Sequence, residues 1–274
     1  MEYILAAIMG VVEGLTEFLP ISSTGHLILA GHFSGFEDML GKEAFDAFSI
    51  IIQLGAILAI VAAYPHRFSG LLRWKENHGF SGLRGISLLA ITTIPASLLA
   101  LLTHKLIHEH LFNAITVAAA LAVGAVWILL TEYYWRPRPK VECLDSLTWR
   151  EAWAIGLFQC LSLWPGMSRA ASTILGGMIS GVERKTATEY SFFAAVPIMI
   201  AATIFELHKS YHDLEGHFQI LAIGFVVSFV VAWLAVKGFV WFLGRHTLAP
   251  FGWYRLCLAA VVFWAAWKYG LVMG

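Results

Sequence analysis

Charged residues are scarce in this chain. Aspartate, glutamate, lysine and arginine make up 13% of its 274 residues, whereas hydrophobic residues make up 59%. A soluble domain carries about 25% charged residues, which help to cover its surface. A chain this apolar could not cover a water-facing surface, so the bilayer is predicted to be its solvent.

Three further absences narrow the function. Cys143, Cys160 and Cys257 are odd in number and far apart, which excludes a disulfide framework and a zinc pattern. The 18 basic and 18 acidic side chains leave no net charge, so no nucleic-acid partner is expected. The chain has no P-loop motif, and nucleotide-driven transport is therefore not indicated.

Six apolar segments have about 20 residues each, the length that a helix needs to cross about 30 Å of hydrocarbon. They are residues 44–64, 85–103, 112–131, 188–207, 218–243 and 250–273. Because such segments run from end to end, we expect residues 1–274 to form a single membrane-embedded domain.

Four other apolar segments are shorter and come as two pairs. The first pair, 3–33, breaks at Leu19-Pro20-Ile21-Ser22, and the second, 152–182, breaks at Trp164-Pro165-Gly166-Met167. Proline and glycine at a break favour a helical hairpin that enters the membrane and turns back. One kinked spanning helix per pair is the alternative. The predicted fold is an all-α polytopic membrane protein with six transmembrane helices and two re-entrant hairpins.

The loop charges predict an orientation. Loops 65–84 and 132–151 carry four basic side chains each, and Arg184, Lys185 and Arg245 lie in two further loops. The opposite loops hold only three lysines. The positive-inside rule places the basic loops in the cytoplasm. Both termini then lie outside, and the two hairpins enter from opposite sides.

The two halves also share a pattern, which predicts inverted repeats over about 1–131 and 152–274. From the glycine at position 10 or 156, a Glu or Gln follows at +3, a hydroxyl at +6 and a serine at +12. Inverted repeats with broken helices commonly build a polar site near the middle of the membrane. Chance similarity between apolar segments is the alternative.

Two carboxylates and one arginine fall inside the two broken apolar segments. Glu13 and Glu17 are four residues apart and share one helix face. An ionised group at the bilayer centre costs about 2.5–3.5 kcal/mol, so both carboxylates and Arg169 need compensation. A structural ion pair with Arg169 is one explanation. A second carboxylate is then left over, which favours a metal or catalytic role.

The segment Ser22-Ser23-Thr24-Gly25-His26 follows the first break. Ser22 or Ser23 could be a simple helix cap, but a helix start also makes an anion site. Ser23 and His26 are three residues apart, the arrangement of a nucleophile beside a base.

The segment Gly166-Met167-Ser168-Arg169 at the second break is typical of a phosphate clamp, with a snorkelling arginine as the alternative. Ser172 and Thr173 can add hydroxyl donors. Gln53 is polar within a span, and the sequence leaves open whether it binds a ligand or joins helices. Two carboxylates, hydroxyls, a histidine and an arginine in a membrane together indicate phosphoryl transfer on a lipid.

Two motifs carry a resemblance that covers essentially the whole chain. They are Glu13-Gly-Leu-Thr-Glu17-Phe-Leu-Pro20-Ile-Ser22-Ser23-Thr24-Gly25-His26 and Pro165-Gly166-Met167-Ser168-Arg169. With them, the sequence resembles the bacterial undecaprenyl-diphosphate phosphatase family, also called the bacitracin-resistance phosphatases. The resemblance implies removal of the terminal phosphate from a polyprenyl diphosphate carrier lipid. It also implies that the protein lies in the inner membrane of a bacterium and that its site opens to the periplasm.

The resemblance also implies residue roles. Glu13 and Glu17 would bind a divalent ion, Mg²⁺ or alternatively Ca²⁺, and assist proton transfer. Arg169 and Ser168 would hold the diphosphate. Ser23 would attack phosphorus with His26 as general base or acid. The expected substrate-binding residues, taken together, are Ser22, Thr24, Gly25, Gln53, Gly166, Ser168, Ser172 and Thr173.

The chain departs from the family pattern at one place, where we expect a change in substrate preference or rate and not in the fold. The family continues Ser-Gly-Ala-Thr after the arginine, whereas this chain has Ala170-Ala171-Ser172-Thr173. Two other functions stay open at this point: a polyprenyl-phosphate lipid transporter or flippase, and a non-catalytic lipid-binding homologue. A homo-oligomer is also left open.

Overall fold

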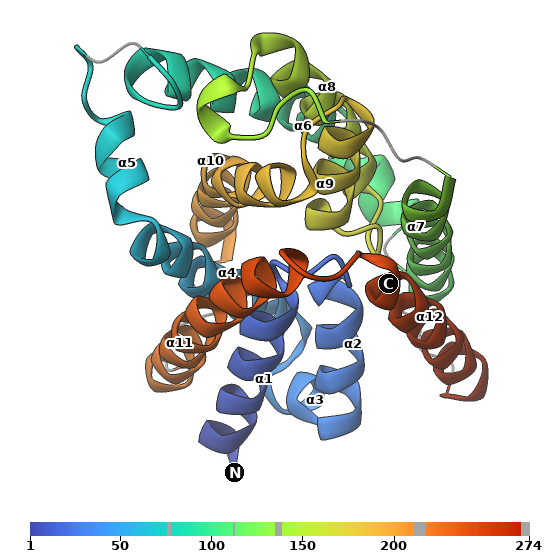
Figure 1. The fold of residues 1–274 in the computed structure, drawn as a ribbon. Helices are drawn as coiled ribbons and strands as arrows, with labels where there is room; N and C mark the ends of the chain where they lie inside the picture. The colour runs from blue at the N-terminus through green and yellow to red at the C-terminus, as the bar shows by residue number, and fades with distance from the viewer. Residues whose placement is uncertain (76–77, 112, 135–138, 211–216, 270–274) are drawn as a thin grey trace.

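The computed structural model describes residues 1–75, 78–111, 113–134, 139–210 and 217–269 (Figure 1). Within these residues the regular structure is helical, apart from one isolated β-bridge between Val141 and Val182. The prediction of an all-α protein is confirmed. The helices are α1 (Glu2–Thr16), α2 (Ser23–Ser34), α3 (Phe36–Leu40), α4 (Lys42–Ala63), α5 (Pro65–Leu71), α6 (Gly82–Leu111), α7 (Ala114–Tyr134), η1 (Leu144–Ser146), α8 (Trp149–Gln159), η2 (Cys160–Leu163), α9 (Arg169–Ile179), α10 (Arg184–Ser210), α11 (Phe218–Leu243) and α12 (Ala249–Tyr269).

Six of the described helices are long and apolar enough to span a membrane, as predicted. The candidate spans are Lys42–Ala63, Gly82–Thr103, Ala114–Tyr134, Arg184–Ile204, Phe218–Leu243 and Ala249–Lys268. Several begin a few residues before the apolar segments do. Their first turns contain charged or small residues, which continue a helix although they are not hydrophobic.

The four short apolar segments form two pairs of short helices, α1 with α2 and α8 with α9. At about 1.5 Å per residue, helices of 11 to 15 residues reach about 17 to 23 Å, less than the hydrocarbon thickness of about 30 Å. The breaks between them lie where proline and glycine predicted them. Entry into the bilayer and return to the same side stays a prediction.

The two breaks have the same backbone geometry. Ser22 precedes α2 with φ 69°, and Ser168 precedes α9 with φ 73°. Among the described residues these are the two non-glycine positions with positive φ. A side chain other than glycine occupies this region only when the surroundings enforce it. The recurrence at equivalent positions supports the internal repeat.

The halves are interlocked, because the first short helix of each pair packs on a long helix of the other half. α1 packs along α11, and α8 packs along α6. The glycines that open the repeat pattern permit both approaches. A Cβ on Gly10 would lie 2.6 Å from the Gly224 carbonyl oxygen, and one on Gly156 would lie 2.8 Å from that of Thr92.

The basic loops meet at one end of the molecule. Arg67 pairs with Asp145 at 2.8 Å, the Lys140 N–H bonds the Gly181 carbonyl, and Arg184 pairs with Glu132 at 2.5 Å. The Glu132 carboxylate also accepts the Leu248 N–H, which joins the loop after α11 to this end. Arg136 and Arg138 of the predicted basic loop lie outside the described residues. In Figure 1, α5 lies at the end opposite α3 and the N-terminus.

The native cysteines offer a test of orientation. In a variant carrying Cys160→Ala and Cys257→Ala, the exposed Cys143 reports on the basic end. We expect a membrane-impermeant maleimide to label Cys143 only after the cells are permeabilised, because the positive-inside rule predicts that the basic end faces the cytoplasm.

The matched control removes Cys143 as well and carries Asp38→Cys at the opposite end. It should be labelled in intact cells. Labelling of Cys143 in intact cells, or failure to label Asp38→Cys there, would overturn the orientation.

Candidate active site

Three predicted residues form one chain of polar contacts. Glu17 Oε1 accepts from Arg169 Nη2 at 3.1 Å, and Glu17 Oε2 accepts from Ser23 Oγ at 2.6 Å. Glu17 directly follows α1, Ser23 begins α2 and Arg169 begins α9. The two breaks therefore bring together residues that are 152 positions apart.

The guanidinium of Arg169 is held on several sides. Its Nη1 donates to the Ser191 carbonyl at 3.0 Å and to Ser191 Oγ at 3.3 Å. Ser191 Oγ in turn bonds Thr173 Oγ1 at 2.6 Å, and the guanidinium lies 5.6 Å from the centre of the Phe18 ring. This packing fixes the fork and leaves few other orientations for it.

A cavity of about 210 Å³ opens beside this chain of contacts and draws its walls from both hairpins, α4 and α10. Eight predicted site residues line it, namely Glu17, Ser22, Ser23, Thr24, Gln53, Gly166, Ser168 and Arg169. Three apolar residues of α10, Ile198, Met199 and Ala202, form another part of the wall together with Pro165. Ser162 also lines the cavity. Its hydroxyl was visible in the repeat pattern, but nothing in the sequence marked it as part of the site.

Glu13 lies fully buried and does not line the cavity. Neither of its carboxylate oxygens has a hydrogen-bond partner among the described residues. A buried, unpartnered carboxylate is costly unless a cation or a proton compensates it. With Glu17 one helical turn away, the donor set fits a hard divalent cation that takes its remaining ligands from substrate and water.

His26 points away from Ser23. Its Nδ1 lies 2.7 Å from the Ser22 carbonyl oxygen, which can only accept, so Nδ1 carries the proton. Nε2 of the neutral ring then accepts from the Tyr254 hydroxyl at 2.6 Å, and the two rings are stacked. The hydrogen-bond partner of Ser23 is thus Glu17, and His26 does not line the cavity. Tyr254 carried no sequence signal, because an aromatic near a span end is typical of the interfacial belt.

Three other expected substrate-binding residues also lie behind the cavity wall. Gly25 packs toward Leu121, and Ser172 Oγ donates to the Ser168 carbonyl at 3.0 Å. Thr173 acts on the site through Ser191. Residues 170–171, where the chain departs from the family pattern, are buried at 1% exposure or less. The departure therefore changes the packing behind Arg169 and not the lining of the cavity.

Arg255, on α12, is not among the site residues that the sequence predicted, and its role in the structure is to hold the backbone around the site. Arg255 is fully buried and donates to five backbone carbonyls at 3.0 to 3.3 Å. These belong to Pro20 at the first break, to Gly166 and Met167 at the second, and to residues 120 and 121 of α7. One side chain therefore ties both breaks to α7.

These features define the class of the protein. It is an all-helical, multi-pass membrane protein in which two helix breaks join a hydroxyl, a carboxylate and a guanidinium in one cavity. Such a set suits phosphoryl transfer in a membrane.

Comparison with known proteins identifies the family. Residues 6–261 match the family described as Bacitracin resistance protein BacA, and the chain belongs to this family. The chain is 55% identical to an undecaprenyl-diphosphatase of Maridesulfovibrio salexigens over 95% of its length and 98% of the relative's. It is 53% identical to one of Solidesulfovibrio magneticus over 96% and 97%. A more distant relative of the same name, from Lawsonia intracellularis, is 42% identical over 94% and 96%. The resemblance noted from the motifs is confirmed.

Arg255 provides a test of how the site is held. Arg255→Gln would leave several buried carbonyls without donors, and each such group costs about 1–3 kcal/mol. We expect a clear fall in the midpoint of thermal unfolding in detergent, by 10 °C or more as an order of magnitude. Arg245→Gln is the control, since Arg245 is exposed and stacks on Trp241. Equal melting of the two variants would show that Arg255 does not hold the breaks together.

Proposed function

We propose that this chain is an integral membrane phosphatase that hydrolyses undecaprenyl diphosphate to undecaprenyl phosphate and orthophosphate. Its family and the names of its relatives support this function. The observation that carries it is the Ser23–Glu17–Arg169 chain of contacts on one cavity wall. A transporter would need a cationic clamp but would have no use for a serine bonded to a carboxylate.

Ser23 is the proposed nucleophile, and Glu17 is the base that the contacts favour. Ser23 Oγ attacks the terminal phosphorus while its proton passes to Glu17 Oε2, 2.6 Å away. The bond from phosphorus to the bridging oxygen breaks, and undecaprenyl phosphate leaves. Water then attacks the phosphoserine, and the bond from phosphorus to Ser23 Oγ breaks as Glu17 returns its proton to that oxygen. The released orthophosphate keeps both protons of the water, and Glu17 is again ionised.

Anion binding would come from Arg169 and from two helix starts. Both α2 and α9 begin at the cavity, at Ser23 and Arg169. The first N–H groups of a helix and its dipole favour a phosphate at that position. The Arg169 fork is aligned by Ser191 and can contact phosphate oxygens as the charge on them grows. The apolar wall formed by residues 198, 199 and 202 suits the first isoprenyl units of the lipid.

Glu13 and Glu17 are proposed to hold a divalent cation, Mg²⁺ in the first instance. With both carboxylates ionised, Glu13, Glu17 and Arg169 carry one net negative charge. A bound divalent ion would make the net charge of this group positive. The cation would neutralise charge on the diphosphate during displacement. The protein's own part is to present Glu13 with both oxygens unpartnered.

The proposed location is the bacterial inner membrane, with the cavity reached from the periplasmic side. The grouping of the basic loops at one end supports this orientation, because that end would face the cytoplasm. The cysteine labelling described above tests it.

His26 is proposed to be a positioning residue, since it holds the Ser22 carbonyl beside the nucleophile. Phosphate release from polyprenyl diphosphate by purified protein tests the division of roles. Ser23→Ala should lower kcat by about 10³-fold or more, and Ser180→Ala, a control at a half-buried hydroxyl just after α9, should leave it unchanged. His26→Gln should lower kcat without removing the neutral-pH limb of the pH profile.

Two results would refute these roles. One is near-normal turnover of well-folded Ser23→Ala. The other is loss of the neutral-pH limb of the profile in His26→Gln, which would make His26 the base.

The cation makes a separate prediction. Chelation should abolish phosphate release, and Mg²⁺ should restore it. Mg²⁺ should also raise the melting temperature of the wild-type protein, because a ligand of the folded state stabilises it. Glu13→Gln should lose this thermal shift and need about tenfold more Mg²⁺ for activity. Full activity in chelator, or an unchanged thermal shift in Glu13→Gln, would contradict the assignment.

A further inference from the structure

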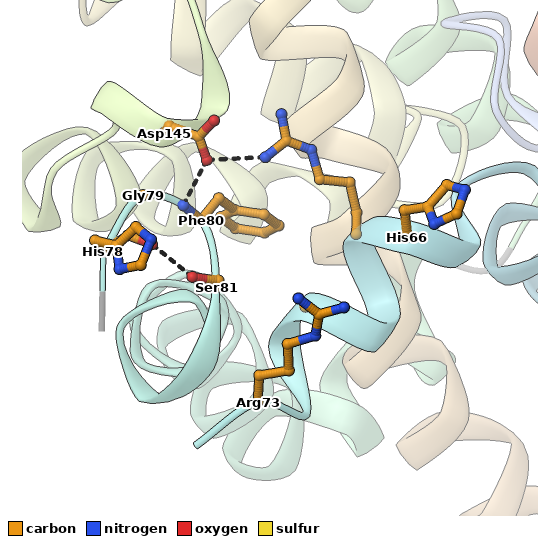
Figure 2. Close-up of a pocket in the computed structure, with 9 residues that line it drawn as sticks. His66, Arg73, His78, Gly79, Phe80, Ser81 and Asp145 are labelled. Carbon is orange, nitrogen blue, oxygen red and sulfur yellow. Dashed lines mark hydrogen bonds and ion pairs between the residues drawn. The ribbon is translucent and has the colours of Figure 1, made fainter. Parts of the chain in front are cut away.

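A second cavity lies at the basic end, far from the active site in the fold. It has a volume of about 480 Å³ and lies between α5, the start of α6 and the η1 segment (Figure 2). Its polar lining consists of His66, Arg67, Arg73, His78, Ser81 and Asp145, and these six define the basic-end pocket. Figure 2 shows His78 and His66 on opposite sides of it, with Arg73 below and Asp145 above.

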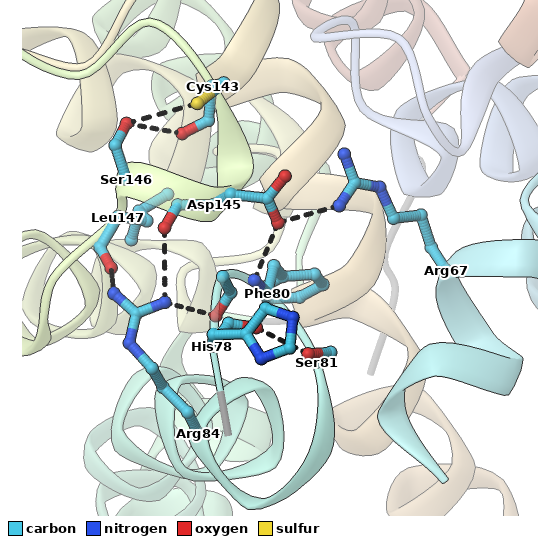
Figure 3. A network of polar contacts seen from close by, with 10 residues as sticks. Arg67, His78, Phe80, Ser81, Arg84, Cys143, Asp145, Ser146 and Leu147 are labelled. Carbon is cyan, nitrogen blue, oxygen red and sulfur yellow. Dashed lines mark hydrogen bonds and ion pairs between the residues drawn. The ribbon is translucent and has the colours of Figure 1, made fainter. Parts of the chain in front are cut away.

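The walls of the basic-end pocket are built by a polar network (Figure 3). Asp145 Oδ1 accepts from Arg67 Nη1 at 2.8 Å and from the Phe80 N–H at 2.7 Å. Arg84, behind the wall, donates to the carbonyls of Gly79, Asp145 and Leu147. Contacts between residues some 60 positions apart thus hold the pocket open.

The charge of the pocket favours an anion. Among the described residues that line the pocket, two arginines and one carboxylate leave a surplus of one positive charge even with both histidines neutral. Partial burial alone would raise the pKa of Asp145. The hydrogen bond from the Phe80 N–H and the charge of Arg67 stabilise the carboxylate more strongly, so the pKa lies below its usual value. Asp145 is therefore ionised at neutral pH and keeps Arg67 in place beside the pocket.

The surroundings of the pocket favour a lipid over a free anion. Leu72 and Trp74 flank Arg73 and are 69% and 65% exposed. Leu83 and Ile86, just after Ser81, begin the exposed apolar face of the spanning helix α6. Tryptophan beside basic residues is typical of the membrane interface, and the face of α6 offers a path for acyl chains.

We propose that the basic-end pocket binds the phosphate headgroup of an anionic phospholipid from the adjacent leaflet, with its acyl chains along α6. The headgroup phosphate meets Arg73 and the outer side of Arg67, and Ser81 can donate a hydrogen bond. Trp74 and Leu72 lie in the interface beside it. The site is separate from the diphosphatase cavity and does not depend on its chemistry.

Native mass spectrometry of the purified protein tests the proposal with dioleoyl phosphatidylglycerol and dioleoyl phosphatidylcholine. The wild-type protein should retain phosphatidylglycerol in preference. Arg73→Gln should weaken that binding about fivefold, and Arg67→Gln with Arg73→Gln should weaken it further, at about 1 kcal/mol per basic residue. Arg150→Gln is the control at the same end, because Arg150 stacks on Trp149 and does not line the pocket.

A variant that is expected to bind more tightly separates a loss of binding from a loss of folding. Asp145→Asn retains an acceptor for the Phe80 N–H but removes the negative charge, so it should bind phosphatidylglycerol more tightly. Equal retention by the wild-type protein, the double arginine variant and Asp145→Asn would overturn the proposal. So would displacement of phosphatidylglycerol by millimolar inorganic phosphate, which would make the ligand a free phosphate.

Discussion

The site depends on one buried cation, Arg255, which gathers backbone carbonyls from both helix breaks and from α7. Breaking a helix inside a membrane leaves carbonyls that no water can satisfy, and each costs several kcal/mol when unpaired. Arg255 satisfies these carbonyls at both breaks at once, and it offsets its own burial by doing so. The same contacts fix the distance between Ser23 on α2 and Arg169 on α9.

A second compensation takes place within the site. Glu17 accepts hydrogen bonds from both Arg169 and Ser23, so its carboxylate orients a guanidinium and a hydroxyl at once. Glu13 has no such partner, and this makes it the residue on which a cation would act most strongly. Burial of ionised groups in a membrane is unfavourable, so these groups favour ligands of opposite charge.

The two ends of the molecule use charge in different ways. At the site, the ion pair between Arg169 and Glu17 is largely enclosed, whereas at the basic end Arg67 and Arg73 line a pocket near the surface. Exposed pairs such as Arg67–Asp145 contribute little stability. Their position between exposed Trp74 and the lipid-facing start of α6 fits recognition of headgroups better than a structural role.

Much followed from the sequence by itself. Apolar length determined the six spans, proline and glycine determined the two breaks, and loop charge indicated which loops share an end. The motif around Glu17 and Ser23 indicated the chemistry, because few other roles justify carboxylates in apolar segments. Only the tertiary structure decided which of these residues meet. Ser23 turned to Glu17 and not to His26, because the positive φ of Ser22 sets the direction of the first turn of α2. The side chains of Ser172 and Thr173 bond to residues behind the cavity wall, and Arg255 of α12 donates to carbonyls at both breaks. Contacts between distant segments leave no periodic pattern in a chain, so spacing alone could not reveal them.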